Sequence, residues 1–157
     1  MFWIIAFLIT LLGSAAQLLL GHQPLTLVHS ADVLLRWIVI FFYGVITLVA
    51  GLQHILNPDR IAQYIGWPAG SGFQLELGWA EVGLGVAACL GFWLPTNSLL
   101  GIAVASSVLY LGAAFVHAQE IARKGNLNPG NAGPVFYVDM LIPILTVFAL
   151  LIIQPWP

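Results

Sequence analysis

Apolar residues run through the chain in five long stretches, separated by short segments rich in polar residues, glycine and proline. A helix needs roughly 20 apolar residues to cross the hydrocarbon core of a bilayer, because each residue adds about 1.5 Å. None of the stretches shows the alternation of a membrane β-strand, and unpaired backbone groups are not tolerated in lipid. The pattern therefore predicts an all-α, polytopic transmembrane helix bundle. The expected spans are residues 2–20, 33–52, 75–94, 98–116 and 135–153.

A sixth, shorter helix is expected between the second and third spans. Asn57 can cap it, Pro58 suits its first position, and Gly66 can end it. Trp67 follows, and tryptophan favours the headgroup level of a membrane. These signals predict an amphipathic helix at residues 58–65 that lies in the membrane interface.

The composition agrees with a chain that presents most of its surface to lipid. Of the 157 residues, 61% are hydrophobic and 6% are charged, whereas about a quarter of the residues of a soluble domain are charged. The net charge of −2 provides no basic face for nucleic acid. The single cysteine, Cys89, allows no internal disulfide. We therefore expect the lipid bilayer as the main partner and exclude nucleic acid.

The few Lys and Arg residues predict the orientation. With five spans, the second and fourth loops lie on the same side as the N-terminus, and they contain Arg60, Arg123 and Lys124. The opposite side has Arg36. Because cytoplasmic loops carry the excess of positive charge, the N-terminus is expected in the cytoplasm and the C-terminus in the periplasm. The first apolar stretch lacks the basic start of a signal peptide, so we interpret it as a retained helix.

Ionisable side chains gather near one face of the predicted bundle. Alternate loops share a side of the membrane, so the depth of a side chain follows from its position in its span. Ionisable residues at membrane depth are typical of ion, proton or ligand sites. The sequence therefore predicts a polar pocket near the cytoplasmic face. Its ionisable members are His54, Glu81, His117, Glu120 and Asp139.

Helical phase adds two tyrosines to this pocket. On the second span Tyr43 shares a face with His54, and on the fourth Tyr110 shares a face with His117. The corresponding face of the third span carries small residues, which let a neighbouring helix approach closely. The glycines on the face of Glu81 are Gly78 and Gly85.

Pro143 gives the pocket a further feature. Proline lacks an N–H, so the carbonyl of Asp139, four residues earlier, loses its helical donor. A freed carbonyl beside a carboxylate at membrane depth attracts a proton, a cation, water or a donor side chain. The structural alternative is that a hydroxyl such as Thr47 or Tyr110 satisfies these groups. The polar residues then form a buried network that fixes the register of the helices.

Metal and haem are two cofactors that the polar residues allow. His117 and Glu120 lie three residues apart on one helix, as ligands do in bundle metal sites. Glu81 and Asp139 would supply carboxylates from neighbouring helices. The paired Glu-x-x-His motifs of such sites are absent, so these four residues are candidates rather than a recognised motif. A haem between His54 and His117 is the other alternative.

A proton-linked or quinone-binding pocket is a further interpretation. Histidine and carboxyl groups in a membrane cleft suit proton transfer. Aromatic side chains can flank a ring-shaped ligand, and the pocket has several close to it. Those candidates are Tyr43 and Tyr110 within the spans and Trp67 and Trp79 at the interface.

The loop before the last span holds the densest turn chemistry of the chain. Its glycine-rich stretch, GNLNPGNAGP (125–134), follows a helix rather than a strand, so it does not fit a phosphate-binding loop. We expect a structured turn that presents Asn128 and Asn131 near the polar cluster. No Walker loop, nucleophile elbow, Cys-x-x-Cys or zincin motif identifies a reaction.

Two segments of the sequence resemble known proteins. The run NPDRIAQYIGWPAGSGFQLELGWAEVGLG (57–85), then His117, then GNLNPGNAGPVFYVDMLIP (125–143), resembles a family of small bacterial integral membrane proteins of unknown function. More loosely, it is similar to the DoxX-type four-helix membrane proteins, some of which are associated with quinone-linked redox systems. The resemblance leaves the first span outside and implies a bacterial inner membrane and a four-helix core. It brings no proven activity, and the cysteines of thiol–disulfide membrane oxidoreductases are absent.

These observations lead to two hypotheses about function. The first is a small inner-membrane protein whose polar pocket binds a proton, an ion or a small redox-linked ligand such as quinone, with Glu81, His117 and Asp139 at its centre. The second is a non-catalytic accessory subunit that packs against a larger membrane complex. A chain with so little mass outside its spans is compatible with both.

Overall fold

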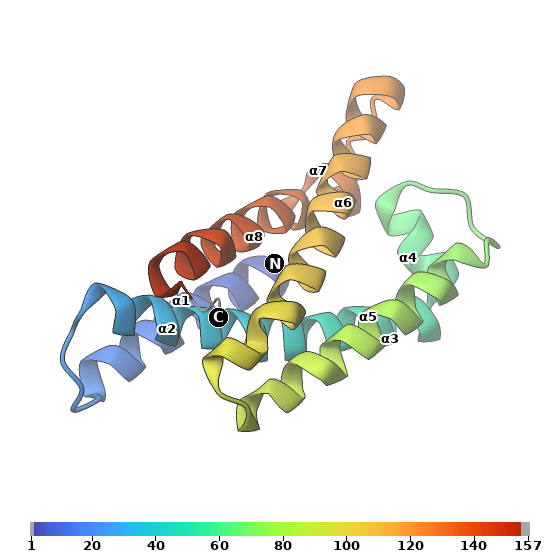
Figure 1. The fold of residues 1–157 in the computed structure, drawn as a ribbon. Helices are drawn as coiled ribbons and strands as arrows, with labels where there is room; N and C mark the ends of the chain where they lie inside the picture. The colour runs from blue at the N-terminus through green and yellow to red at the C-terminus, as the bar shows by residue number, and fades with distance from the viewer. Residues whose placement is uncertain (1, 155–157) are drawn as a thin grey trace.

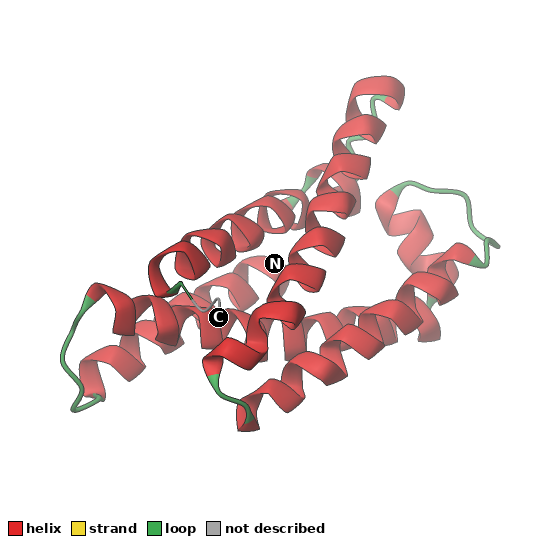
Figure 2. Cartoon of the chain, in the orientation of Figure 1, coloured by secondary structure: helices red, strands yellow, loops and turns green. Residues whose placement is uncertain are grey.

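The computed structural model describes residues 2–154, and within them the chain forms helices joined by short loops, with no strand (Figure 2). The predicted all-α fold class is confirmed. Five helical units are long and apolar enough to cross a membrane, which supports a multi-pass membrane protein. These units are Phe2–Leu20, Leu27–Leu56, Phe73–Trp93, Thr96–Lys124 and Pro129–Ile153.

Most of these units contain more than one helical element. The first unit is the single helix α1 (Phe2–Leu20). The second consists of α2 (Leu27–Trp37), the π-helix η1 (Ile38–Ile46) and α3 (Thr47–Leu56). The third joins α5 (Phe73–Leu90) to the 3₁₀ turn η2 (Gly91–Trp93), and the fourth joins the turn η3 (Thr96–Leu99) to α6 (Leu100–Lys124). The fifth contains α7 (Pro129–Ala132) and α8 (Pro134–Ile153).

The helix boundaries follow the sequence signals closely, with two larger differences. The short helix α4 (Pro58–Ile65) has the bounds that the capping residues predict. The second unit begins at Leu27 rather than at 33, because the Thr26 hydroxyl caps it by accepting the N–H of His29 at 3.2 Å. Helix α6 continues past 116 to Lys124, where Gly125 ends it in the left-handed region with φ of 63°. The first residues of the expected loop, up to Lys124, therefore lie on the same helix as His117.

The π-helix η1 occupies the middle of the second unit. It widens the helix, so that the Thr47 hydroxyl donates to the carbonyl of Phe42, five residues earlier, at 3.2 Å. π-Helices are rare and occur frequently at functional sites. Here η1 turns Tyr43 into the bundle, where the side chain is fully buried. The segment therefore brings a tyrosine hydroxyl to the centre of the membrane-spanning part.

Helices α3 and α5 lie side by side along most of their length (Figure 1). The predicted small-residue face of α5 makes this contact, because Gly78 and Gly85 are buried against α3. Helix α8 packs on α6 and α2, and α1 packs on α2. The last turns of α6 project beyond the neighbouring helices in Figure 1.

Different polar contacts hold the two ends of the bundle. At one end α4 contacts α7, and the Asn126 side chain donates to the carbonyl of Ile65 at 2.9 Å. We name this the α4 end. At the other, the α2 end, Arg36 donates to the Thr96 hydroxyl at 3.0 Å and to the Leu94 carbonyl at 3.1 Å. These bonds tie α2 to the turn between α5 and α6.

Candidate functional site

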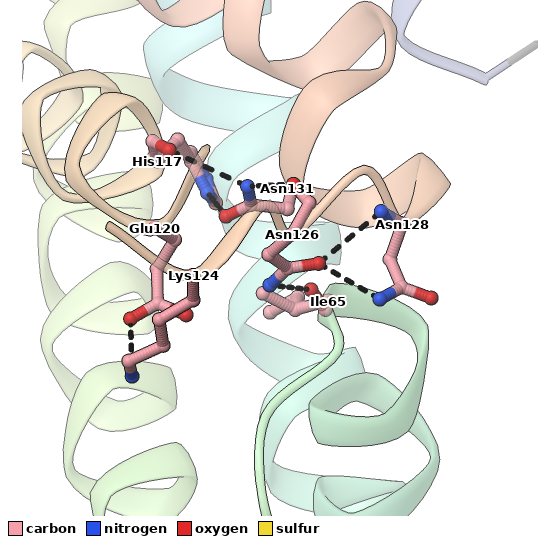
Figure 3. Close-up of polar contacts among 7 residues, drawn as sticks. All are labelled: Ile65, His117, Glu120, Lys124, Asn126, Asn128 and Asn131. Atoms are coloured by element: carbon pink, nitrogen blue, oxygen red, sulfur yellow. Dashed lines mark hydrogen bonds and ion pairs between the residues drawn. The ribbon is translucent and has the colours of Figure 1, made fainter. Parts of the chain in front are cut away.

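His117 is the centre of the best-defined polar contact at the α4 end. Its Nδ1 lies 2.8 Å from Oδ1 of Asn131 (Figure 3). Its Nε2 lies 3.7 Å from Oδ2 of Asp139. Both His117 and Asp139 are less than one-tenth exposed. The histidine comes from α6, and the carboxyl comes from the second turn of α8. The predicted approach of these two residues is present in the structure.

The amide of Asn131 has one orientation that satisfies its neighbours. Its Nδ2 group donates to the carbonyl of Asn126 at 2.8 Å and to that of His117 at 3.4 Å. Its Oδ1 must therefore accept the hydrogen bond from Nδ1 of His117. Neutral His117 thus carries its proton on Nδ1 and turns an unprotonated Nε2 toward Asp139.

His54 makes a second pairing of the same kind on α3. Its Nδ1 lies 2.5 Å from Oε1 of Gln74, at the start of α5. Its Nε2 lies 3.8 Å from Oε2 of Glu81, which is one of the buried atoms without a hydrogen-bond partner within residues 2–154. Both distances from Nε2 to a carboxyl oxygen exceed a hydrogen bond. Each histidine therefore faces a carboxyl across a short gap.

The two pairs form one cluster that four helices build. Gln74, which bonds His54, and Trp67, whose ring centroid lies 6.4 Å from that of His117, line the same surface depression. His54 belongs to α3, Glu81 to α5, His117 to α6 and Asp139 to α8. We name these four residues the histidine–acid cluster.

Glu120 lies beside this cluster without joining it. Its carboxylate binds the ammonium of Lys124 at 2.7 Å, one helical turn further along α6 (Figure 3). Within the part of the chain that the structure describes, no three His, Cys, Asp or Glu side chains come together in a group that could hold a metal ion. The arrangement thus favours paired titratable groups over the four-residue metal set of His117, Glu120, Glu81 and Asp139. The Nε2 atoms of His54 and His117 face different carboxyls, which does not favour a shared haem.

The tyrosines form a separate layer of hydroxyls deeper in the bundle. The Tyr110 hydroxyl lies 2.7 Å from that of Thr47. The Tyr43 hydroxyl lies 2.9 Å from Ser107 and 3.1 Å from Thr146. Thr47 and Tyr110 thus bond each other, and Asp139 has no hydrogen bond to either. We name these five residues the hydroxyl layer.

A surface depression of about 320 Å³ lies next to the histidine–acid cluster. Its aromatic wall is Trp67 and Phe73, whose ring centroids are 5.8 Å apart. Gln74 lines it too, so the amide that bonds His54 is also in contact with the depression. Trp67 is the one expected ring-flanking residue that lines it. Tyr43 and Tyr110 are buried in the hydroxyl layer, and Trp79 is 65% exposed on the outside of α5.

Comparison with known proteins gives a family but no activity. A family model described as a family of unknown function, DUF6790, matches residues 1–156. The chain belongs to the DUF6790 family. The predicted membership in an uncharacterised family is confirmed, and the DUF6790 match includes the first span. No curated protein and no solved structure matches the chain.

Two residues of the candidate site, Gln74 and Asn126, were not predicted from the sequence. Gln74 lies before Glu81 on α5, on the same face at a spacing of two helical turns, and that spacing could have identified it. Asn126 has no such signal, because its bonds to Ile65 and Asn128 depend on how the loop meets α4. Asn131 lies at the cluster as predicted, whereas Asn128 bonds Asn126 and has no contact with the histidines.

Proposed function

We propose that this DUF6790 protein binds and releases protons at the histidine–acid cluster, in the cytoplasmic membrane of a bacterium, and that the proton is linked to a small ligand. The observation that carries the proposal is that Nε2 of His117 lies 3.7 Å from Oδ2 of Asp139. Nδ1 of His117 is already hydrogen-bonded to Asn131, so Nε2 is the ring nitrogen that can exchange a proton. Both facing atoms are hydrogen-bond acceptors when the pair holds no shared proton. The pair therefore gains an attractive interaction when one proton binds to either atom.

Because each pair is buried, its free energy depends strongly on the number of protons it holds. Two acceptors facing each other away from water are unfavourable, and so is an isolated charge. One proton resolves both problems, because a carboxylic acid can donate to Nε2 or an imidazolium can pair with the carboxylate. The His54–Glu81 pair repeats this arrangement.

The position of the charges supports a site near the cytoplasm. Arg60, Arg123 and Lys124 belong to the α4 end, whereas Arg36 is at the α2 end. Positive loops stay in the cytoplasm, so the proposed orientation places the α4 end there. Protons would then exchange with the cytoplasm.

The depression beside Gln74 is where we propose that the small ligand binds. Its aromatic wall suits a flat ring, and Gln74 offers an amide next to His54. Lys124 and Glu120, which also line it, neutralise each other at 2.7 Å. An uncharged ring with carbonyl groups, such as a quinone, fits that surface better than an anion does.

The experiment is a pH titration of histidine side chains labelled with ¹⁵N in protein reconstituted into nanodiscs. The chain has four histidines, and exposed His22 serves as the internal reference. We expect His117 to show Nδ1–H with bare Nε2 at high pH and to gain a proton at Nε2 on acidification. Asp139→Asn should abolish that step, because its amide can donate to Nε2 and keep the ring neutral.

Two results would contradict the proposal. One is a His117 spectrum that does not change with pH in the wild type. The other is that Glu81→Gln, His117→Ala and Asp139→Asn each lower thermal stability, while every histidine that remains in each variant titrates as in the wild type. In that case the cluster fixes the register of the helices.

A further inference from the structure

The polar side chains of the bundle are arranged in layers along its axis. The histidine–acid cluster lies at the α4 end. Thr47 comes seven residues before His54 on α3, and Thr146 comes seven residues after Asp139 on α8. At 1.5 Å per residue, the hydroxyl layer therefore lies about 10 Å deeper in the membrane-spanning part. The hydroxyl of Ser106, next to Ser107, is buried at that depth without a partner among the described residues.

Beyond the hydroxyl layer the bundle is filled with apolar side chains. Five of the larger ones have no exposed surface and belong to one packed core. On the second unit they extend from Leu35 to Phe42, or about 10 Å of helix. The buried hydroxyls of α1, Thr10 and Ser14, donate to carbonyls of their own helix. The apolar residues, which we name the apolar plug, are Leu35, Ile38, Val39, Phe42 and Leu99.

The polar contacts at the α2 end lie on the far side of this plug. There Thr96 donates to Asp32 at 2.5 Å, and Arg36 lies 3.7 Å from the same carboxylate. Arg36 and Asp32 are each about 30% exposed, so they belong to the surface. Leu35, next to Arg36 in the chain, points into the core and is fully buried. The plug thus separates these groups from the hydroxyl layer.

We infer that the histidine–acid cluster and the hydroxyl layer form a one-sided proton well, which opens at the α4 end beside Gln74 and is closed toward the α2 end by the apolar plug. This inference rests on the proposed function, because it concerns where the proton of that site can go. It assigns the protein to proton storage or local proton exchange rather than to conduction across the membrane.

The physical basis is the cost of moving a proton through apolar surroundings. A proton travels along water or hydroxyl groups, and a charge in a dry apolar medium is strongly unfavourable. The described residues of the plug offer no polar side chain to carry it. At the α4 end the barrier is short, because Gln74 contacts both the depression and His54. Gln74 itself is 3% exposed, so its amide is the short polar step between the depression and His54.

Proton flux in vesicles tests the closed side. Wild-type protein is reconstituted with a pH-sensitive dye in the lumen, and a pH step is applied with the membrane potential clamped. We expect the flux to equal that of vesicles containing Asp139→Asn and of protein-free vesicles. Wild-type flux above both controls would overturn the one-sided well.

The double variant Ile38→Ser with Phe42→Ser should open the plug and raise the flux above the wild-type level, provided that it keeps its helical circular dichroism. A folded double variant that leaks no more than wild type would contradict the assignment of the plug.

Hydrogen–deuterium exchange of the buried carboxyl groups tests the open side. The infrared band of the protonated acids is followed after transfer into deuterated buffer. Gln74→Leu should slow the exchange of the carboxyl protons by at least about tenfold relative to the wild type. That factor corresponds to a change of about 1.4 kcal/mol in the activation barrier. The matched control is Gln53→Leu, an exposed glutamine on α3. Equal exchange rates in the two variants would contradict entry beside Gln74. The ¹⁵N titration of His117 is independent of both measurements, so failure of the well is distinguishable from failure of the proton site.

Discussion

Gly51 and Gly78 pack backbone against backbone where α3 crosses α5. A Cβ placed on Gly51 would lie 2.7 Å from the carbonyl oxygen of Gly78, and one placed on Gly78 would lie 2.8 Å from that of Gly51. Neither oxygen can move aside, because each belongs to a helical backbone. This contact holds the two helices at the separation that lets His54 on α3 face Glu81 on α5. The packing and the proposed site are therefore linked.

We predict that Gly51→Ala destabilises the protein by about 1–3 kcal/mol, the usual cost of overpacking a filled contact. The measurement is thermal unfolding in detergent, followed by circular dichroism. The control is Gly83→Ala on the facing helix α5, where an added Cβ meets nothing within 4 Å. That variant should be neutral or slightly stabilising, because alanine favours helix more than glycine does. Equal melting temperatures for the two variants would contradict the close packing.

We predict that Asn131→Ala costs about 1–3 kcal/mol of stability, because it leaves buried polar groups without partners. Nδ1 of His117 and the carbonyl of Asn126 each lose a bond to Asn131. Asn131→Ala should also remove the preference of neutral His117 for the Nδ1–H tautomer. Its ¹⁵N spectrum at high pH should then show both ring nitrogens partly protonated. Asn128→Ala is the control, because Asn128 has no contact with the histidine. A single Nδ1–H tautomer in Asn131→Ala would show that another group positions His117.

The spans and the depth of the polar residues were predictable because each depends on local information. An apolar stretch of about 20 residues identifies a membrane helix without knowledge of its neighbours. Helical phase likewise placed His117 and Asp139 at one depth. The hydrogen-bond partners were less accessible, because they depend on how helices rotate against each other. The π-helix η1 has no recognised sequence signal, and it sets which way Tyr43 points.

We predict that Tyr43→Phe destabilises the protein more than Tyr110→Phe does. The Tyr43 hydroxyl bridges Ser107 on α6 and Thr146 on α8, whereas that of Tyr110 has the one partner Thr47. Thr47 keeps a bond to the Phe42 carbonyl after the loss of Tyr110. At about 0.5–1.5 kcal/mol for each bond lost, the two variants should differ by about one bond. Urea or thermal unfolding of both variants in the same detergent measures the difference. The reverse order of stability would contradict the bridging role of Tyr43.

The last prediction concerns Gly66 and Gly125, the two glycines with positive φ that end helices at the α4 end. Gly66 ends α4 with φ of 87°, and Gly125 ends α6 with φ of 63°. An alanine at either position adopts an unfavourable backbone conformation, at about 1–2 kcal/mol. A Cβ on Gly125 meets nothing, whereas a Cβ on Gly66 would collide with the side chains of Asn126 and Asn128.

Gly66→Ala should therefore lose about 1–3 kcal/mol more than Gly125→Ala, the additional cost of the collision. Because Asn126 also supplies the carbonyl that orients Asn131, the change should reach the histidine–acid cluster. We expect Gly66→Ala to alter the ¹⁵N signal of His117, and Gly125→Ala to leave it as in the wild type. Thermal unfolding gives the first comparison, and the labelled-histidine spectrum gives the second. If both variants leave the His117 signal unchanged, the loop holds α4 in place without positioning the histidine.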